Sequence, residues 1–352
     1  MTLNGLLPLR VLVVDDSAFN RRNIAEIFAE SPTIDVVGKA ADGEEALRLV
    51  DALKPDAITL DLEMPRMDGF TFLRILMKKR ATPVIVVSSY SQKENIFKAL
   101  ELGALDFVAK PDRYGDPELH AIREELVRKV LLVRSIRRLG VPARSERGDG
   151  FGRSLDGRSN VPLTSPQKVV AIASSTGGPS ALMEIFTCLP PNYPHAILIA
   201  QHMPDKFTRT FAERLNRRSQ LSVSEAQDRD GVFAGSAFVC PGRQCLEVEA
   251  GGRGALSLRV LSPSEQDQYV PSADRLLASA ATLGRRAVGV ILTGMGDDGV
   301  QGARAILDAG GIVVAEAEST AIVYGMPGAA VRAKAATMSL PLGEIVDFLT
   351  RL

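Results

Sequence analysis

The feature that most constrains the fold is an alternation of short apolar runs with segments of helical periodicity. In the first part of the chain the apolar runs lie at residues 11–14, 34–37, 57–60, 84–87 and 107–109. Segments with apolar residues at helical spacing follow them. Strands that alternate with helices predict a parallel sheet with helices on both faces.

Polar side chains follow most of these runs, at the edge where open α/β sheets place their sites. Asp15 and Asp16 follow the first run, and Asp61 follows the third. These carboxylates repel one another unless a cation joins them, and oxygen ligands alone suit Mg²⁺. Ser88 and Lys110 reach the same edge. Together these side chains predict a phosphoryl acceptor site, with a carboxylate nucleophile, Mg²⁺, and a hydroxyl and an ammonium group to hold phosphoryl oxygens.

A strand–turn–helix corner at residues 169–186 opens the second part of the chain. An apolar run ends in the polar turn Ser-Ser-Thr-Gly-Gly, and Pro179 suits the first turn of a helix. A serine in such a corner lies at a helix N-terminus, where backbone N–H groups can stabilise an oxyanion. Ser175 is therefore a candidate nucleophile, and a polar loop that only caps the helix is the alternative.

One histidine falls at the same edge as Ser175. His202 closely follows the apolar run at 196–200. His195 begins that run, about 20 Å away at roughly 3.3 Å per residue, and His120 lies in the first part of the chain. His202 is therefore the candidate base, although a loop residue remains the alternative.

The loop at 293–299 admits two interpretations. Its glycines spell G-x-G-x-x-G between a strand and a helix, and Glu316 stands where a ribose-binding acid would. Against a dinucleotide site, Asp297 and Asp298 occupy the helix N-terminus, where we expect them to repel a pyrophosphate and take the N–H groups themselves. The loop then presents an aspartate, which completes a set of nucleophile, base and orienter in any chain order.

Composition narrows the alternatives further. Lys+Arg and Asp+Glu both number 42, a balance that does not point to a nucleic-acid or anionic-membrane partner. The three cysteines have no metal-binding spacing, which favours a reduced compartment. No stretch is long enough to cross a bilayer, and the start of the chain does not resemble a signal peptide, so we expect a cytoplasmic protein.

Four segments of the first part resemble receiver domains of two-component systems: VLVVDDS, DLEMPRMDG, VIVVSS and FVAKP. The resemblance implies a flavodoxin-like domain over residues 9–130 that a histidine kinase phosphorylates on Asp61. The implied Mg²⁺ ligands are Asp16, Asp61 and the Glu63 carbonyl, with Asp15 in support. Ser88 and Lys110 would sense the phosphoryl group, and Phe107 takes the place of the signalling aromatic.

Six segments of the second part resemble the catalytic domain of the chemotaxis protein-glutamate methylesterases: STGGP, QHMP, FTRTFAERLN, PSADRLL, LTGMGDDG and VYGMPG. The resemblance implies Ser175 as nucleophile, His202 as base and Asp298 as third member. Thr176 and the backbone N–H of Met295 would contribute to the substrate and oxyanion site. The family usually has Gly-Ala before STGG, whereas this chain has Ala173-Ser174, so Ser174 is expected to alter the local hydrogen bonding.

The expected architecture is a receiver domain, a flexible linker at 131–165 and a doubly wound parallel α/β esterase domain at 166–352. Alternation around a Gly-rich turn at 233–261 predicts a β-hairpin appended to the parallel sheet. The resemblance implies phosphorylation-activated hydrolysis of glutamate γ-methyl esters, and deamidation of glutamines, on methyl-accepting chemotaxis receptors. The receiver would need Mg²⁺, and the esterase no cofactor.

Two other classes of protein stay open at this point. A DNA-binding response regulator would need a basic helix–turn–helix output domain. For this chain we expect no nucleic-acid partner and no membrane insertion. A nicotinamide-dependent enzyme would need to bind a dinucleotide at the glycine-rich loop.

Overall fold

The computed structural model describes residues 7–89, 93–110, 116–139 and 164–352. The chain divides into two units, residues 1–146 and 147–352, each of which is described by itself. Among the described helices, none is both long and apolar enough to cross a membrane.

The first unit is a five-stranded parallel sheet with strand order β2-β1-β3-β4-β5. Its strands are β1 (Leu9–Val14), β2 (Ile34–Ala40), β3 (Ala57–Leu60), β4 (Val84–Ser89) and β5 (Asp106–Lys110). Its helices are α1 (Ala18–Ala29), α2 (Gly43–Leu53), α3 (Gly69–Lys79), α4 (Lys93–Glu101) and α5 (Asp116–Leu139). Helix α1 contacts α5, and α2 contacts α3. This is the predicted flavodoxin-like arrangement.

The second unit is built on a seven-stranded parallel sheet with strand order β14-β13-β12-β6-β7-β9-β8. Its strands are β6 (Val169–Ser174), β7 (Ala196–Gln201), β8 (Ser222–Glu225), β9 (Ser236–Val239), β12 (Ala287–Ile291), β13 (Ile312–Glu316) and β14 (Met338–Leu340). Strands β6 and β7 lie inside the sheet, and every residue of both is buried. Burial on both faces explains why each is a continuous apolar run.

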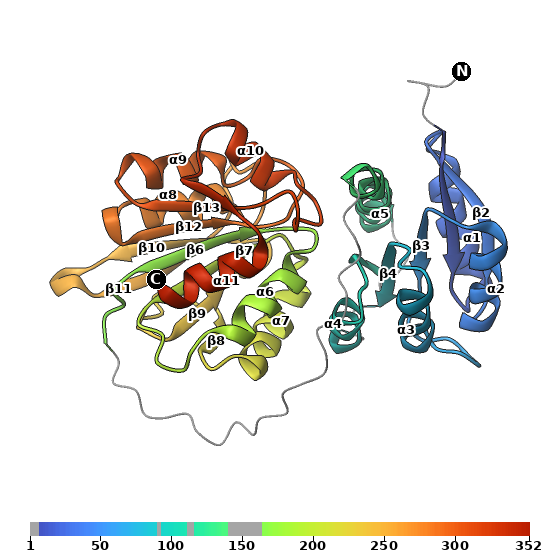
Figure 1. Cartoon of the computed structure of the whole chain (residues 1–352), viewed down its shortest axis with the longest axis horizontal. Helices are drawn as coiled ribbons and strands as arrows, with labels where there is room; N and C mark the ends of the chain where they lie inside the picture. Colours follow the sequence, from blue (N-terminus) through green and yellow to red (C-terminus); the bar gives the residue numbers. More distant parts are fainter. Residues whose placement is uncertain (1–6, 90–92, 111–115, 140–163) are drawn as a thin grey trace. The chain divides into compact units, whose positions relative to one another are not determined.

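Helices cover both faces of this sheet (Figure 1), as the doubly wound prediction requires. One group is α6 (Gly178–Cys188), α7 (Asp205–Arg218) and α11 (Leu342–Arg351); the other is α8 (Ala273–Ala281), α9 (Val300–Asp308) and α10 (Met326–Arg332). Alternate residues of β6, such as Val169 and Ala171, share a core cluster with Leu276 and Leu277 of α8. Short 3-10 helices occupy Gly252–Gly254 and Gly284–Arg286.

The structure modifies two details of the sequence predictions. The expected hairpin exists as β10 (Cys245–Ala250) and β11 (Leu256–Leu261), an antiparallel pair, but it forms a sheet of its own, and Leu246 and Leu258 join the α8 core cluster. Helix α5 continues to Leu139, so the first residues of the predicted linker, 131–139, are helical. Residues 140–163 lie outside the described residues, and the domain limits stay a prediction.

Candidate functional site

The ends of β6 and β7 place Ser175 beside His202. Ser174 and Gln201 are paired in register at the ends of these strands, and the His202 N–H donates to the Ser174 carbonyl at 2.9 Å. Two glycines then allow the turn into α6. Gly177 has φ +79°, and a Cβ on Gly178 would lie 2.1 Å from Gln201 Oε1. The sequence STGG therefore folds into the tight corner that the pattern predicts.

His202 is hydrogen-bonded to Asp298. Its Nε2 lies 2.7 Å from Asp298 Oδ2, and Asp298 is buried whereas His202 is partly exposed. The same carboxylate accepts from two backbone N–H groups at the start of α8: Ala273 N reaches Oδ2 at 2.8 Å and Asp274 N reaches Oδ1 at 2.9 Å. Because Nε2 faces Asp298, Nδ1 is the ring nitrogen left to exchange a proton with a nucleophile.

The structure brings the three predicted residues to one edge of the sheet. In the part of the chain that the structure describes, no hydrogen bond joins the Ser175 hydroxyl to His202. Such bonds are often loose without substrate and tighten in the reactive complex. His195 lies at the opposite end of β7, where its ring contacts Tyr193 edge-to-face with centroids 5.0 Å apart.

Asp297 and Asp298 differ in their surroundings. Asp297 is exposed and accepts from the Tyr269 hydroxyl at 3.2 Å. The expectation that both aspartates take the N–H groups of the following helix is wrong. The Asp298 carboxylate binds the N-terminus of α8 instead, and among the described residues the Asp297 carboxylate accepts only from the Tyr269 hydroxyl. In the following helix, α9, the N–H of Gly302 donates to Asp274 Oδ1 at 2.8 Å.

Protein atoms occupy the space that the glycines of G-x-G-x-x-G leave. A Cβ on Gly294 would lie 2.8 Å from the Cβ of Ser175, and a Cβ on Gly296 would lie 2.6 Å from the Tyr269 hydroxyl. Glu316 is buried, and its carboxylate accepts from Thr293 N at 2.8 Å and from Thr320 Oγ1 at 3.0 Å. The glycines thus serve packing, and Glu316 serves the fold, so the dinucleotide interpretation does not fit.

Thr176 lies in the serine corner itself, and Met295 lies in the glycine-rich loop that contacts this corner. Thr176 is buried, and its carbonyl accepts from Thr293 Oγ1 at 2.9 Å. Met295 is 37% exposed, and two residues before it the Thr293 carbonyl accepts from Ser175 N at 3.0 Å. The loop before Met295 is therefore tied directly to the turn that carries Ser175.

Two residues that the sequence analysis did not single out complete this site. Gln201 accepts from Ser174 Oγ at 2.7 Å and donates through Nε2 to the carbonyls of Ser175 (3.0 Å) and His202 (2.9 Å). Tyr269 stacks on His202, with ring centroids 5.4 Å apart and planes 8° from parallel. Gln201 directly precedes His202 in the QHMP segment, and this position could have identified it as part of the site. No pattern in the sequence indicated Tyr269.

The first unit gathers the predicted acidic residues. The carboxylate oxygens of Asp15, Asp16 and Asp61 lie within 4.8 Å of one another. Lys110 Nζ lies 2.5 Å from Asp61 Oδ2 and 2.7 Å from Asp15 Oδ2. Burial raises the pKa of Asp61, although the charge of Lys110 opposes the shift. A compact set of oxygen ligands fits Mg²⁺, so the residues present suit the ion that the sequence predicts.

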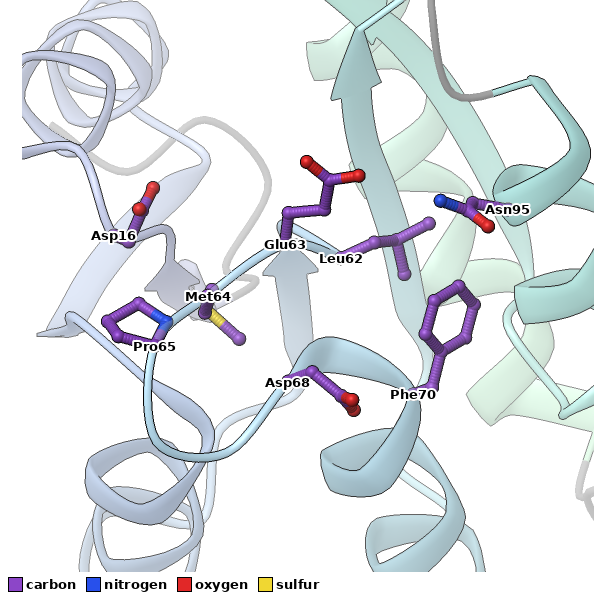
Figure 2. Close-up of a pocket in the computed structure, with 8 residues that line it drawn as sticks. All are labelled: Asp16, Leu62, Glu63, Met64, Pro65, Asp68, Phe70 and Asn95. Atoms are coloured by element: carbon purple, nitrogen blue, oxygen red, sulfur yellow. The ribbon is translucent and has the colours of Figure 1, made fainter.

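Figure 2 shows a hollow beside this cluster, lined in part by Asp16, Glu63, Phe70 and Asn95. Its volume is about 590 Å³. Asp16 and Glu63, two residues of the predicted Mg²⁺ site, both line it.

The remaining predicted residues of the receiver are buried. Ser88 lies near the end of β4, in register with Ala109 of β5. Phe107 contacts Phe97 of α4 edge-to-face at 6.4 Å, and Lys129 Nζ of α5 lies 5.1 Å from its ring centroid. Phe107 thus packs between the sheet and two helices.

Comparison with known proteins agrees with this division. Residues 170–349 match the profile of the CheB methylesterase family, and residues 11–122 match the response regulator receiver domain. A protein-glutamate methylesterase/protein-glutamine glutaminase of Anaeromyxobacter dehalogenans is 49% identical over 96% of this chain and 93% of its own length. A second, from Geobacter sulfurreducens, is 47% identical over 92% of this chain and 91% of its own length.

A solved structure resembles the second unit. The crystal structure of the Thermotoga maritima CheB methylesterase catalytic domain is 37% identical, with a TM-score of 0.51. The match covers 52% of this chain and 97% of the solved domain.

Proposed function

Because the chain belongs to the CheB family of protein-glutamate methylesterases/protein-glutamine glutaminases and carries a receiver domain, we propose that phosphorylation of its receiver controls hydrolysis of glutamate γ-methyl esters on methyl-accepting chemotaxis receptors. Glutamine side chains of the same receptors would be deamidated by the same route. The proposed triad is Ser175, His202 and Asp298. One observation carries the assignment: a buried carboxylate holds His202 by Nε2 at 2.7 Å, at the strand end beside Ser175.

The proposed reaction passes through an acyl-enzyme. His202 Nδ1 takes the proton of the Ser175 hydroxyl as Oγ attacks the γ-carbonyl carbon. Thr176 and the backbone N–H of Met295 would contribute to the substrate and oxyanion site. When the tetrahedral intermediate collapses, the C–O bond to the methoxy group breaks and His202 returns the proton, which releases methanol. Water then repeats the sequence on the acyl-enzyme and leaves a γ-carboxylate.

Methanol release from methylated receptors tests this assignment. We expect Ser175→Ala to abolish nearly all release, because a triad works as a unit. The matched control is Ser174→Ala, which keeps the neighbouring nucleophile and removes a buried hydroxyl that bonds Gln201. Loss of activity in Ser174→Ala together with near-normal activity in Ser175→Ala would show that Ser175 is not the nucleophile.

For the receiver we propose Asp61 as phosphoacceptor, with a cytoplasmic chemotaxis histidine kinase as donor. Asp16, Asp61 and the Glu63 carbonyl, with Asp15 in support, would hold Mg²⁺. The ion would neutralise negative charge on the transferred group. Ser88 and Lys110 would hold phosphoryl oxygens, and Phe107 would repack in response.

Labelling with acetyl phosphate tests the receiver site. Asp61→Asn should lose both the label and the stimulation of methanol release, while basal release remains. Asp51→Asn is the matched control, because Asp51 is an exposed aspartate of the same unit that pairs with Lys79. Label that persists in Asp61→Asn, or that needs no Mg²⁺, would contradict the proposal.

A further inference from the structure

Tyr269 lies flat against the imidazole of His202 and is itself fixed at its far end. The two rings are 8° from parallel with centroids 5.4 Å apart. The hydroxyl donates to Asp297 Oδ1 at 3.2 Å and occupies the space that Gly296, with φ +91°, leaves open. A residue with a side chain at 296 would collide with the tyrosine. The glycine-rich loop is therefore shaped to receive this ring.

The segment that carries Tyr269 is anchored to the fold by a buried carboxylate two residues earlier. Asp267 Oδ2 accepts from Ser264 N at 2.7 Å and from Arg275 Nη1 at 3.0 Å, and its side chain is 5% exposed. Arg275 belongs to α8 and also donates to Glu247 of β10, at 2.6 Å through Nη2. The segment before Tyr269 is thus tied to α8 and to the hairpin, which limits movement of the tyrosine ring.

We propose that Tyr269 is a positioning residue that keeps the His202 ring in its reactive orientation, an inference that rests on the proposed triad. A χ2 rotation of the imidazole would withdraw Nε2 from Asp298 and so change where Nδ1 points, and terminal torsions of this type are broad. The parallel ring occupies the space into which the imidazole would turn. Its π face also attracts the imidazolium that forms when His202 accepts the serine proton.

Two substitutions separate the stacked ring from its hydroxyl. Tyr269→Leu removes the aromatic face, and we expect kcat for methanol release to fall about tenfold with KM nearly unchanged, since misorientation of a catalytic group acts on the chemical step. Tyr269→Phe keeps the face and loses only the bond to Asp297, so kcat should stay within about twofold. An unchanged kcat in Tyr269→Leu, or an equal loss in both variants, would overturn the proposal.

Imidazole nitrogen NMR gives a readout that needs no substrate. The chain has only three histidines, and His202→Ala assigns the signal. We expect a protonated Nε2 and an unprotonated Nδ1 for His202 in the parent and in Tyr269→Phe, and averaging of the two nitrogens in Tyr269→Leu. An unaltered pattern in Tyr269→Leu would overturn the proposal. Averaging in that variant, in a protein whose parent releases no methanol, would support the positioning role and reject the proposed esterase function.

Discussion

Three hydrogen-bond donors converge on the carboxylate of Asp298. His202 Nε2 and Ala273 N reach Oδ2, and Asp274 N reaches Oδ1. An asparagine has only one acceptor atom, so in Asp298→Asn its NH₂ group must face a donor whichever way it turns. We expect methanol release to fall by about 10²-fold or more, yet less than in Ser175→Ala, because Asp298, as the proposed third member, would orient the histidine without taking the proton. Urea unfolding should show a loss of roughly 1–3 kcal/mol.

Asp297→Asn is the control for this prediction. Asp297 is exposed and, in the described part of the chain, accepts a side-chain hydrogen bond only from Tyr269, and an asparagine can still accept it. Its activity and its free energy of unfolding should stay close to those of the parent. A greater loss of activity in Asp297→Asn than in Asp298→Asn would show that the wrong aspartate was assigned to His202.

At the scale of helices and strands, the sequence predicts what repeats locally. Buried strands such as β6 and β7 are continuous apolar runs because both faces of a parallel sheet are covered. The end of α5 could not be predicted in the same way. Leu132 and Val133 are adjacent and both buried, so the apolar residues there do not follow the spacing of a one-sided helix. Contacts between segments distant in the chain leave no local pattern. The hydrogen bonds of Asp298 to the first turn of α8, and the stacking of Tyr269 on His202, could therefore be found only in the three-dimensional structure.

Two carboxylates, the buried Asp298 and the half-buried Asp274, connect the N-termini of α8 and α9. Asp298 accepts from the first turn of α8, and Asp274 in that turn accepts from Gly302 of α9. Burial raises the pKa of Asp274; the Gly302 N–H opposes the shift and the nearby charge of Asp298 adds to it. A folded-state pKa above the unfolded value means that ionisation of Asp274 costs stability as the pH rises through that range.

Asp274→Asn removes this charge and keeps an acceptor for Gly302. We expect the variant to be more stable than the parent at pH ~7, and the difference to shrink at pH ~4.5, nearer the ordinary aspartate pKa of about 3.9. Urea unfolding at both pH values measures the two gaps. A variant that is less stable by the same amount at both values would show that the charge of Asp274 does not oppose folding.

At the scale of the whole molecule, each unit has a sheet and buried apolar residues of its own. Thr164 already belongs to the second unit, since its carbonyl accepts from Ala234 N at 2.9 Å. A fragment that begins at residue 161 therefore retains the described elements of the second unit, and we expect it to unfold cooperatively on its own.

This fragment tests how the receiver would exert control. If the unphosphorylated receiver restrains the esterase, the fragment should release methanol faster than the unphosphorylated whole chain and should not respond to acetyl phosphate. Each tenfold difference corresponds to about 1.4 kcal/mol between restrained and active states, a bias that a modest interaction between two domains can supply. The comparison needs both proteins at equal concentration on the same methylated receptors. A folded fragment that is no faster than the unphosphorylated parent would mean that the receiver acts as a positive activator or as a localisation module.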